Sequence, residues 1–239
     1  MTQGSVLFDR KLLRERRRRA QALGPVTFLI DRVVGELAER LSAVLRRFEL
    51  AADLGTPNDA VRRALTDKVG TIAEVVADEE ALPFRDASLD LVVSALALQF
   101  VNDLPGALIQ VRRALKPDGL FLAALLGGDT LTELRQSFAA AETEIEGGVS
   151  PHVAPFADVR DLGALLQRAG FALPVTDVDR LTVRYSTAFA LMHDLRRMGA
   201  TNALVARRRV PLRRKTMLRM AEIYAERFAD PDGRLRATF

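Results

Sequence analysis

Leu89-Asp90-Leu91-Val92-Val93-Ser94-Ala95-Leu96 is the stretch that decides the fold of this 239-residue chain. The turn-forming residues Asp86-Ala87-Ser88 precede it. A nearly continuous apolar run of this length is typical of a strand buried on both faces of a parallel sheet. The runs from Phe48 to Leu54 and from Leu120 to Leu126 have the same character. The sequence therefore predicts a parallel β-sheet.

Helical segments alternate with these strands. Leu104, Leu108, Val111 and Leu115 recur on one helical face, and Pro117-Asp118-Gly119 ends that helix. Such alternation predicts a doubly wound α/β fold, which binds ligands at the carboxyl ends of its strands. We also expect strands at 69–77 and 173–183 and helices at 60–65, 129–142, 158–169, 187–199 and 212–229.

The chain divides into three expected domains. Residues 9–46 have helical periodicity, with a break at Gly24-Pro25, so residues 1–46 are predicted to form a helical extension. Residues 47–183 are the predicted α/β core, and residues 184–239 form a basic helical cap.

Composition excludes several classes of protein. About half of the residues are apolar (49%), enough for a full core, and the chain has no Cys for a disulfide framework, a zinc knuckle or a thiol nucleophile. The longest apolar stretch, Leu89 to Phe100, is too short to cross a bilayer. Residues 1–20 lack the apolar segment of a secretory signal. We therefore expect a cytoplasmic protein.

Charge is concentrated in two segments. Residues 1–20 carry +5 and residues 196–219 carry +9, which leaves −10 on the rest of the chain. These arginines either form a docking surface for an anionic partner or lie as a solvated face along the acidic part of the chain. Neither segment interleaves aromatic residues with its arginines, so we do not expect nucleic-acid binding.

A set of ordered motifs indicates the cofactor. Asp53-Leu54-Gly55 ends one strand, Glu74 ends the next, and the run from Ala77 to Phe84 precedes a buried strand. Together with the run from Leu115 to Gly119, this order resembles the class I S-adenosylmethionine-dependent methyltransferases. Gly55 would allow the cofactor to approach the backbone closely. Carboxylates can accept hydrogen bonds from the ribose hydroxyls and from the adenine amino group.

A narrower resemblance covers nearly the whole chain. Seven long and unusual runs carry it: Phe8 to Arg10, Val76 to Glu80, Val101 to Pro105, Gly127 to Arg135, Ala141 to Glu144, Glu146 to His152 and Arg168 to Phe171. In these runs the chain is similar to the assembly factor 5 family of respiratory complex I. The resemblance implies a methyltransferase-like fold, and in mitochondrial members it implies hydroxylation of an arginine on a complex I subunit. It also implies that a last strand begins near residues 236–239, so we expect the chain to be truncated at that end.

Carried onto this sequence, the resemblance implies a set of cofactor-binding residues: Asp53, Gly55, Glu74, Asp78, Glu79, Ser94 and Ala95. Glu74 can equally be a solvent-facing strand end. The chain departs from the family pattern at Thr56-Pro57-Asn58-Asp59, in place of a glycine-rich turn, and at Gln99-Phe100, in place of His-Trp. Pro57 lacks an N–H group, so we expect weak cofactor binding.

The spacing before Asp78 is short. Only 20 positions run from Gly55 through Glu74. Two crossovers and a middle strand need roughly 29 residues. Either the strands here are compressed, or a segment is absent from the chain, which is the interpretation that we favour.

Three polar positions are candidate substrate contacts: Gln99, Asp129 and His152. Glu142 and Glu146 share a helical face, and His152 could fold back onto them as a metal site, but an exposed helix end is the favoured interpretation. Asp129 or Thr130 is expected to cap the helix that follows. We predict no metal site, and the sequence assigns no catalytic residue.

These observations predict an S-adenosylmethionine-binding enzyme that modifies a protein substrate, such as a complex I subunit, by hydroxylation or by methyl transfer. One alternative is an O-methyltransferase for a small-molecule or acyl-carrier carboxyl group. Another is an assembly chaperone whose altered glycine loop no longer supports catalysis. The oligomeric state is left open.

Overall fold

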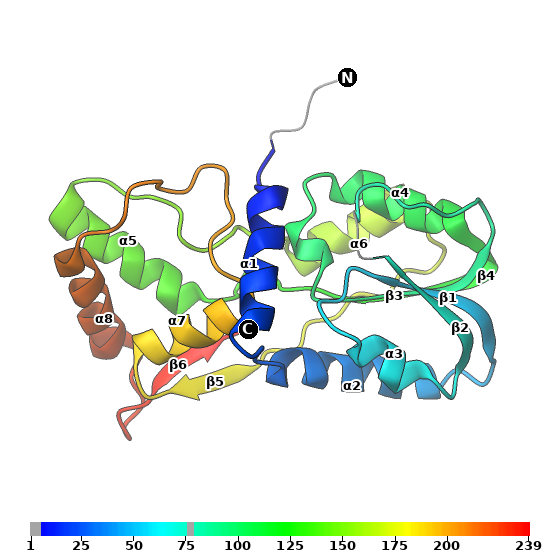
Figure 1. Cartoon of the computed structure of the whole chain (residues 1–239), viewed down its shortest axis with the longest axis horizontal. Helices are drawn as coiled ribbons and strands as arrows, with labels where there is room; N and C mark the ends of the chain where they lie inside the picture. The colour runs from blue at the N-terminus through cyan, green and yellow to red at the C-terminus, as the bar shows by residue number, and fades with distance from the viewer. Residues whose placement is uncertain (1–5, 76–78) are drawn as a thin grey trace. The chain divides into compact units, whose positions relative to one another are not determined.

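The computed structural model describes residues 6–75 and 79–239. The chain forms two compact units, each assembled from distant segments (Figure 1). Unit 1 comprises Thr27–Leu126 and Ala157–Asp177, and unit 2 comprises Val6–Val26, Gly127–Phe156 and Val178–Phe239.

The helices and strands alternate over the first half of the chain, as the sequence predicts. In chain order they are α1 (Arg10–Ala22), α2 (Phe28–Ser42), β1 (Phe48–Leu54), α3 (Ala60–Leu65), β2 (Val69–Val75), β3 (Leu89–Ala95), the 3-10 helix η1 (Leu98–Phe100), α4 (Leu104–Ala114), β4 (Leu115–Ala124), α5 (Thr132–Glu146), α6 (Val159–Arg168), β5 (Thr182–Tyr185), α7 (Ala188–Arg197), α8 (Arg214–Phe228) and β6 (Leu235–Thr238).

Unit 1 is a parallel four-stranded sheet between helices. The strand order is β2-β1-β3-β4, and every pair is parallel. Helices α2 and α3 cover one face, and α4 and α6 lie on the other (Figure 1). The predicted parallel sheet is therefore confirmed.

The sheet is buried because its strands are apolar on both faces. Leu91 and Val93 pack with Leu41 of α2 in one core cluster, while Val92 packs with Val111 of α4 in another. The carboxylate of Asp103 accepts a hydrogen bond from the Gly106 amide and caps α4 at 2.9 Å. These contacts hold the carboxyl ends of β1, β2 and β3 in register.

Unit 2 is mainly helical, and its core lies among α5, α7, α8 and the hairpin β5–β6. Met220, Ile223 and Tyr224 of α8 are fully buried there. The Tyr224 hydroxyl donates to the backbone oxygen of Arg236 at 2.7 Å, which ties the hairpin to α8. Buried Glu133 of α5 accepts hydrogen bonds from the backbone N–H and hydroxyl of Thr238.

The predicted strand at 173–183 is mostly wrong. Only Thr182–Tyr185 forms a strand, and it pairs antiparallel with β6. Leu173 and Val175 are 94% and 87% exposed, because no neighbouring strand pairs with that stretch in the described structure. Alternating apolar residues predict a strand only where a sheet edge is available to them.

The predicted cap of α5 is also wrong. The helix begins at Thr132, and its N-cap is Leu131, which is in the left-handed conformation and makes no side-chain capping bond. Asp129 instead forms a 2.5 Å ion pair with Arg180, and both side chains are mostly exposed. The carboxylate of Glu133, in the first turn of α5, instead accepts hydrogen bonds from the N–H and hydroxyl of Thr238.

The short segment after β1 contains one crossover. The six-residue helix α3 leads directly into β2, which pairs with β1 from Phe48↔Val69 to Leu54↔Val75. Within the described part of this segment, no second strand lies between β1 and β2. The given residues form a compressed arrangement, and the interpretation that a segment is absent from the chain stays a prediction.

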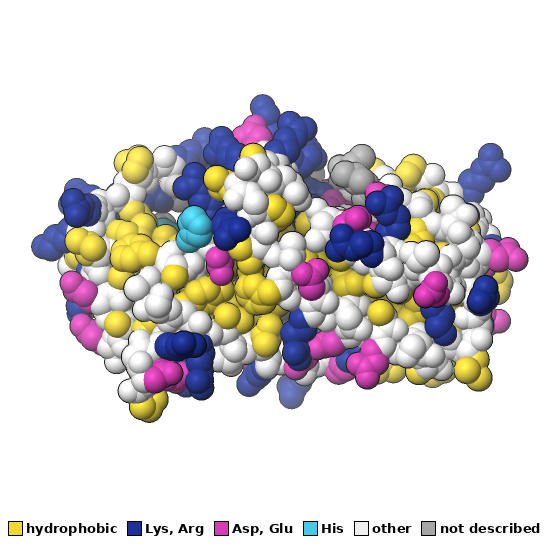
Figure 2. All heavy atoms as spheres, turned by 60° about the horizontal axis from the view of Figure 1, so that its bottom comes forward, with side chains coloured by type: hydrophobic (Ala, Val, Ile, Leu, Met, Phe, Trp, Pro, Cys, Tyr) yellow, Lys and Arg dark blue, Asp and Glu magenta, His cyan; other side chains and the backbone are white. Residues whose placement is uncertain are grey.

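The arginines of residues 207–208 pair with acids of their own unit. Arg207 contacts Asp9 at 3.2 Å, and Arg208 contacts Glu146 at 3.3 Å. Other basic side chains, Lys11, Arg14, Arg18 and Arg19 of α1, are exposed, and Figure 2 shows dark-blue side chains gathered over that helix.

Among the described residues, no helix is long and apolar enough to span a membrane.

Replacing Arg207, Arg208 and Arg209 together with Ala should lower the melting temperature of the protein. Two of the three form ion pairs with acidic side chains of unit 2. Because salt screens such pairs, the melting temperature should fall more at low salt than at high salt. A thermal melt at two ionic strengths measures it. The triple variant Lys11→Ala, Arg14→Ala, Arg18→Ala on α1 is the control, and an equal loss in both variants would contradict the pairing.

Candidate functional site

Most of the predicted cofactor residues lie at one edge of the sheet in unit 1. Asp53 ends β1, Glu74 lies opposite it on β2, and Val93 lies opposite it on β3. Ser94 and Ala95 follow Val93 directly. Parallel strands bring these positions together because their carboxyl ends share one edge.

Asp53 is a buried carboxylate at this edge with a strongly shifted pKa. Its residue is only 4% exposed. Burial raises the pKa of Asp53 to about 6, and the charge of Glu74 adds to the increase, while hydrogen bonds from Thr56 oppose it. A buried carboxylate that is held in this way is typical of a functional site.

Thr56 connects β1 to β3. Its hydroxyl donates to Oδ1 of Asp53 at 2.5 Å and accepts a hydrogen bond from the Ala95 amide at 3.2 Å. Sequence reasoning treats Thr56 only as a departure from a glycine-rich turn. Its place directly after Gly55 in a strand-end loop is the one signal that could have indicated it.

Glu79 lies against Gly55. Gly55 has φ of +72°, and a Cβ added to it would be 2.4 Å from Oε1 of Glu79. The positive φ favours glycine at position 55, and the absent side chain leaves room for the buried Glu79 carboxylate beside the backbone. Asn102 donates its backbone N–H to Oε1 of Glu80, and Gln110 donates to the Glu80 carbonyl, so the segment that carries Glu79 is tied to α4.

The other predicted cofactor residues differ in what they contact. Ser94 is fully buried and donates its hydroxyl to the Leu54 carbonyl at 2.8 Å, which makes it a bond between strands. The partly exposed carboxylate of Glu74 pairs with Nε of Arg62 at 3.3 Å. Asp78 lies outside the described residues.

Gln99 lies in η1, just after β3, and is 8% exposed. Its Nε2 donates to the carbonyl of Leu96 at 3.0 Å. Its Oε1 is buried, and no hydrogen-bond partner for it is present in the described structure. Gln99 therefore carries an unused hydrogen-bond acceptor.

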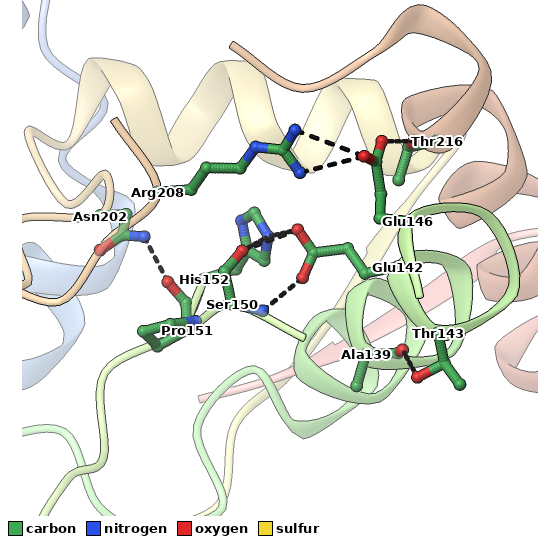
Figure 3. A network of polar contacts seen from close by, with 10 residues as sticks. All are labelled: Ala139, Glu142, Thr143, Glu146, Ser150, Pro151, His152, Asn202, Arg208 and Thr216. Atoms are coloured by element: carbon green, nitrogen blue, oxygen red, sulfur yellow. Dashed lines mark hydrogen bonds and ion pairs between the residues drawn. The ribbon is translucent and has the colours of Figure 1, made fainter. Parts of the chain in front are cut away.

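A second polar cluster lies in unit 2, where His152 folds back onto α5 (Figure 3). Nε2 of His152 donates to Oε1 of Glu142 at 3.0 Å, because a carboxylate can only accept. Ser150 donates to the same carboxylate through its N–H at 2.6 Å and its hydroxyl at 2.7 Å. The His152 ring stacks on Phe138 with centroids 4.0 Å apart.

The predicted exposed helix end is wrong for Glu142, whose side chain is 1% exposed. Burial raises its pKa, but the hydrogen bonds from Ser150 and His152 outweigh that effect and hold the pKa below its usual value. Glu146 binds Thr216 and Arg208 instead of His152 (Figure 3). In the described structure, no group of three or more His, Asp or Glu side chains could hold a metal.

A comparison with known proteins identifies the family. The mouse protein "Arginine-hydroxylase NDUFAF5, mitochondrial" is 42% identical over 257 aligned positions, which cover 98% of this chain and 75% of the mouse protein. The chain belongs to the NDUFAF5 family. The alignment is longer than the 239 residues of the chain, so the mouse relative carries residues that have no counterpart here.

Two further comparisons show the enzyme class of this NDUFAF5-family protein. Residues 34–123 match a methyltransferase domain model. A malonyl-[acyl-carrier protein] O-methyltransferase from Laribacter hongkongensis is 45% identical over 167 positions, covering 70% of this chain and 54% of the relative. The predicted methyltransferase-type enzyme is thereby confirmed.

A solved structure supports the fold. The candidate methyltransferase BH2331 from Bacillus halodurans superposes with a TM-score of 0.54 at 17% identity, covering 86% of this chain and 94% of that protein. The predicted methyltransferase-like α/β fold of the NDUFAF5-family chain is confirmed. The three expected domain boundaries remain predictions.

The hydrogen-bond acceptors at the sheet edge suit S-adenosylmethionine chemically. That cofactor offers hydroxyl and amino donors and a cationic sulfonium, and this edge offers the carboxylates of Asp53, Glu74 and Glu79. Gly55 has the positive φ and the absent side chain that let the Glu79 carboxylate lie against its backbone.

Proposed function

We propose that this protein binds S-adenosylmethionine at the carboxyl ends of β1, β2 and β3 and hydroxylates an arginine side chain of a protein substrate, with an external oxidant supplying the inserted oxygen atom. The observation that carries the proposal is the similarity to the mouse arginine hydroxylase over 98% of this chain. A subunit of complex I is the proposed substrate, and the bacterial-type cytoplasm remains the predicted location.

Asp53, Gly55 and Glu79 are the proposed centre of the cofactor site, with Glu74 at its rim. The buried carboxylate of Asp53 would face a cationic or hydrogen-donating group of the cofactor, because an ionised acid in a low-dielectric site attracts such groups strongly. Ser94 and Thr56 support the proposal indirectly, since they fix the strand ends on which the site stands.

Methyl transfer to a carboxyl group is the second candidate. The similarity to the malonyl-[acyl-carrier protein] O-methyltransferase favours it, although that similarity covers a smaller share of the chain. The reaction would place the transferred methyl group on an acyl-carrier or small-molecule carboxylate.

The alternative of a catalytically inactive assembly chaperone is not proposed, because the chain belongs to a family of enzymes. The loop Thr56-Pro57-Asn58-Asp59 bears on affinity instead, because Pro57 offers no N–H group to a ligand and the loop contains no glycine.

Mass spectrometry of a co-expressed complex I subunit tests the proposal. Hydroxylation should add the mass of one oxygen atom to an arginine-containing peptide, whereas methylation adds the mass of one methylene group. An unmodified subunit would contradict both enzymatic candidates. A subunit that gains only the methylene mass would contradict hydroxylation.

Calorimetric titration with S-adenosylmethionine should give a dissociation constant weaker than about 1 μM, which corresponds to roughly 8 kcal/mol of binding free energy. The reason is that one glycine, rather than a glycine-rich loop, serves the site, and Glu79 already occupies the space beside it. A substantially tighter constant would show that the altered loop does not weaken binding.

A further inference from the structure

The strongest unexplained feature of the molecule is the side chain of Gln99. Its Oε1 is buried without a hydrogen-bond partner in the described structure, while Nε2 is bonded. The Leu96 carbonyl decides which end of the Gln99 amide is the nitrogen and which is the oxygen. A carbonyl oxygen of Leu96 can only accept, so the NH2 group must face it and the oxygen must face away.

A buried acceptor without a donor is unfavourable in a folded protein, and native structures contain few of them. A second unfavourable feature lies next to it. Leu96 has φ of +54°, a conformation that non-glycine residues rarely adopt. Strain of this kind clusters at binding and catalytic sites, so the pair of features indicates function rather than packing.

The position of Gln99 connects it with the proposed cofactor residues. Leu96, whose carbonyl Gln99 binds, directly follows Ala95, and the Ala95 amide binds Thr56, which in turn binds Asp53. Leu96 also donates its N–H to Ala124 of β4 at 2.9 Å. Gln99 is therefore held by the same strand ends that carry Asp53 and Gly55.

The chemistry of the missing partner can be stated. An amide oxygen accepts a hydrogen bond from an N–H or O–H donor. A guanidinium group carries five N–H donors and no acceptor, and the carboxylates Asp53, Glu74 and Glu79 at this edge favour a cation. We propose that Oε1 of Gln99 receives an N–H of the substrate's guanidinium group, so that Gln99 is a substrate-binding residue.

This inference rests on the proposed function, because it takes an arginine as substrate. An amino group of the cofactor offers the same donor chemistry. The two sources are distinguished by measuring both ligands with the same variants.

Gln110 of α4 provides a matched control. Both ends of its amide are bonded, because Oε1 accepts from the Leu82 amide at 3.0 Å and Nε2 donates to the Glu80 carbonyl at 2.8 Å. Gln99→Met and Gln110→Met remove the same polar group from the same unit, but only the first removes an unused acceptor, so the two are compared in thermal melts. Gln136→Met in unit 2 is the control for binding, because its amide donates only to the Thr132 hydroxyl of its own helix, at 3.3 Å, in the described structure.

The experiment titrates the full chain with N-acetyl-arginine N-methylamide, with its norleucine counterpart and with S-adenosylmethionine. Binding is followed by NMR on side-chain amide signals, and the Gln99 signal is assigned by its loss in Gln99→Met. The arginine probe should shift that signal and the norleucine probe should not. Gln99→Met should lower the affinity of the protein for the arginine probe about ten-fold or more, as expected when a hydrogen bond to a charged group is lost. Gln136→Met should bind it as the unmodified chain does.

Thermal melts provide a second readout. Gln110→Met should melt at a lower temperature than Gln99→Met, because it leaves the Leu82 amide without its acceptor. The reverse order would show that the Gln99 oxygen has a stabilising partner and would contradict the proposal.

Three binding results would overturn it. They are an arginine probe that fails to shift the Gln99 signal, equal affinity in Gln99→Met, and a loss of affinity for S-adenosylmethionine alone. None of these depends on hydroxylation, which is judged separately by the mass of the modified subunit.

Discussion

Replacing Glu142 with Ala should destabilise unit 2 by about 3 kcal/mol, the cost expected when a buried carboxylate that binds several donors is removed. The variant leaves the N–H and hydroxyl of Ser150 and Nε2 of His152 without their acceptor. Urea denaturation followed by circular dichroism measures the free energy of unfolding.

Glu144→Ala is the matched control for this variant. Glu144 lies on the same helix, but its side chain is 45% exposed and pairs with Arg219 at the surface. It should change the free energy of unfolding much less than Glu142→Ala does. Equal losses in the two variants would show that the network in Figure 3 adds nothing to stability beyond a surface ion pair.

The same network should make stability depend on pH. Hydrogen bonds hold the folded-state pKa of Glu142 below its usual value in spite of burial. An acid of this kind stabilises the fold above its unfolded-state pKa, and that contribution is lost as the pH falls through the lower folded-state value. Glu142→Gln should remove this part of the acid sensitivity, and a denaturation series below pH 5 measures it.

Asp53→Asn should increase stability while it weakens cofactor binding. Burial raises the pKa of Asp53 to about 6 from an ordinary value of 3.8, so the folded state holds a proton more tightly than the unfolded state does. The free energy of unfolding therefore falls as the pH rises between these values, by roughly 2 to 3 kcal/mol. An amide avoids that penalty and keeps an acceptor for Thr56.

We therefore expect Asp53→Asn to be more stable than the unmodified chain at pH 8 and similar to it near pH 4. It should bind S-adenosylmethionine about ten-fold more weakly, as expected when a charged hydrogen bond to the ligand is lost. Asp90→Asn is the control with the opposite sign, because hydrogen bonds from Leu50 and Lys116 lower the pKa of Asp90 in spite of its burial. A destabilised Asp53→Asn at pH 8 would contradict the raised pKa.

Local sequence determined the strands, several helix ends and the family. The runs Phe48–Leu54 and Leu89–Ala95 contain enough apolar side chains to be buried on both faces, and a parallel sheet between helices is the arrangement that buries them. Asp103 caps α4 because its carboxylate needs only a backbone N–H three residues away. Such features depend on neighbours in the chain, so a sequence can specify them.

Tertiary structure alone decided which distant groups meet. Glu79 takes the space beside Gly55, and Glu142 rather than Glu146 receives His152. Among the described residues, no strand pairs with the stretch around Leu173. Each outcome depends on a partner far away in the chain. Asn102 and Gln110 hold the segment of Glu79. Arg208 and Thr216 bind Glu146, and strand β6 pairs with β5. Motifs and spacing identify residues able to make such contacts, but the choice among them depends on which burial and hydrogen-bonding partners the folded chain brings within reach.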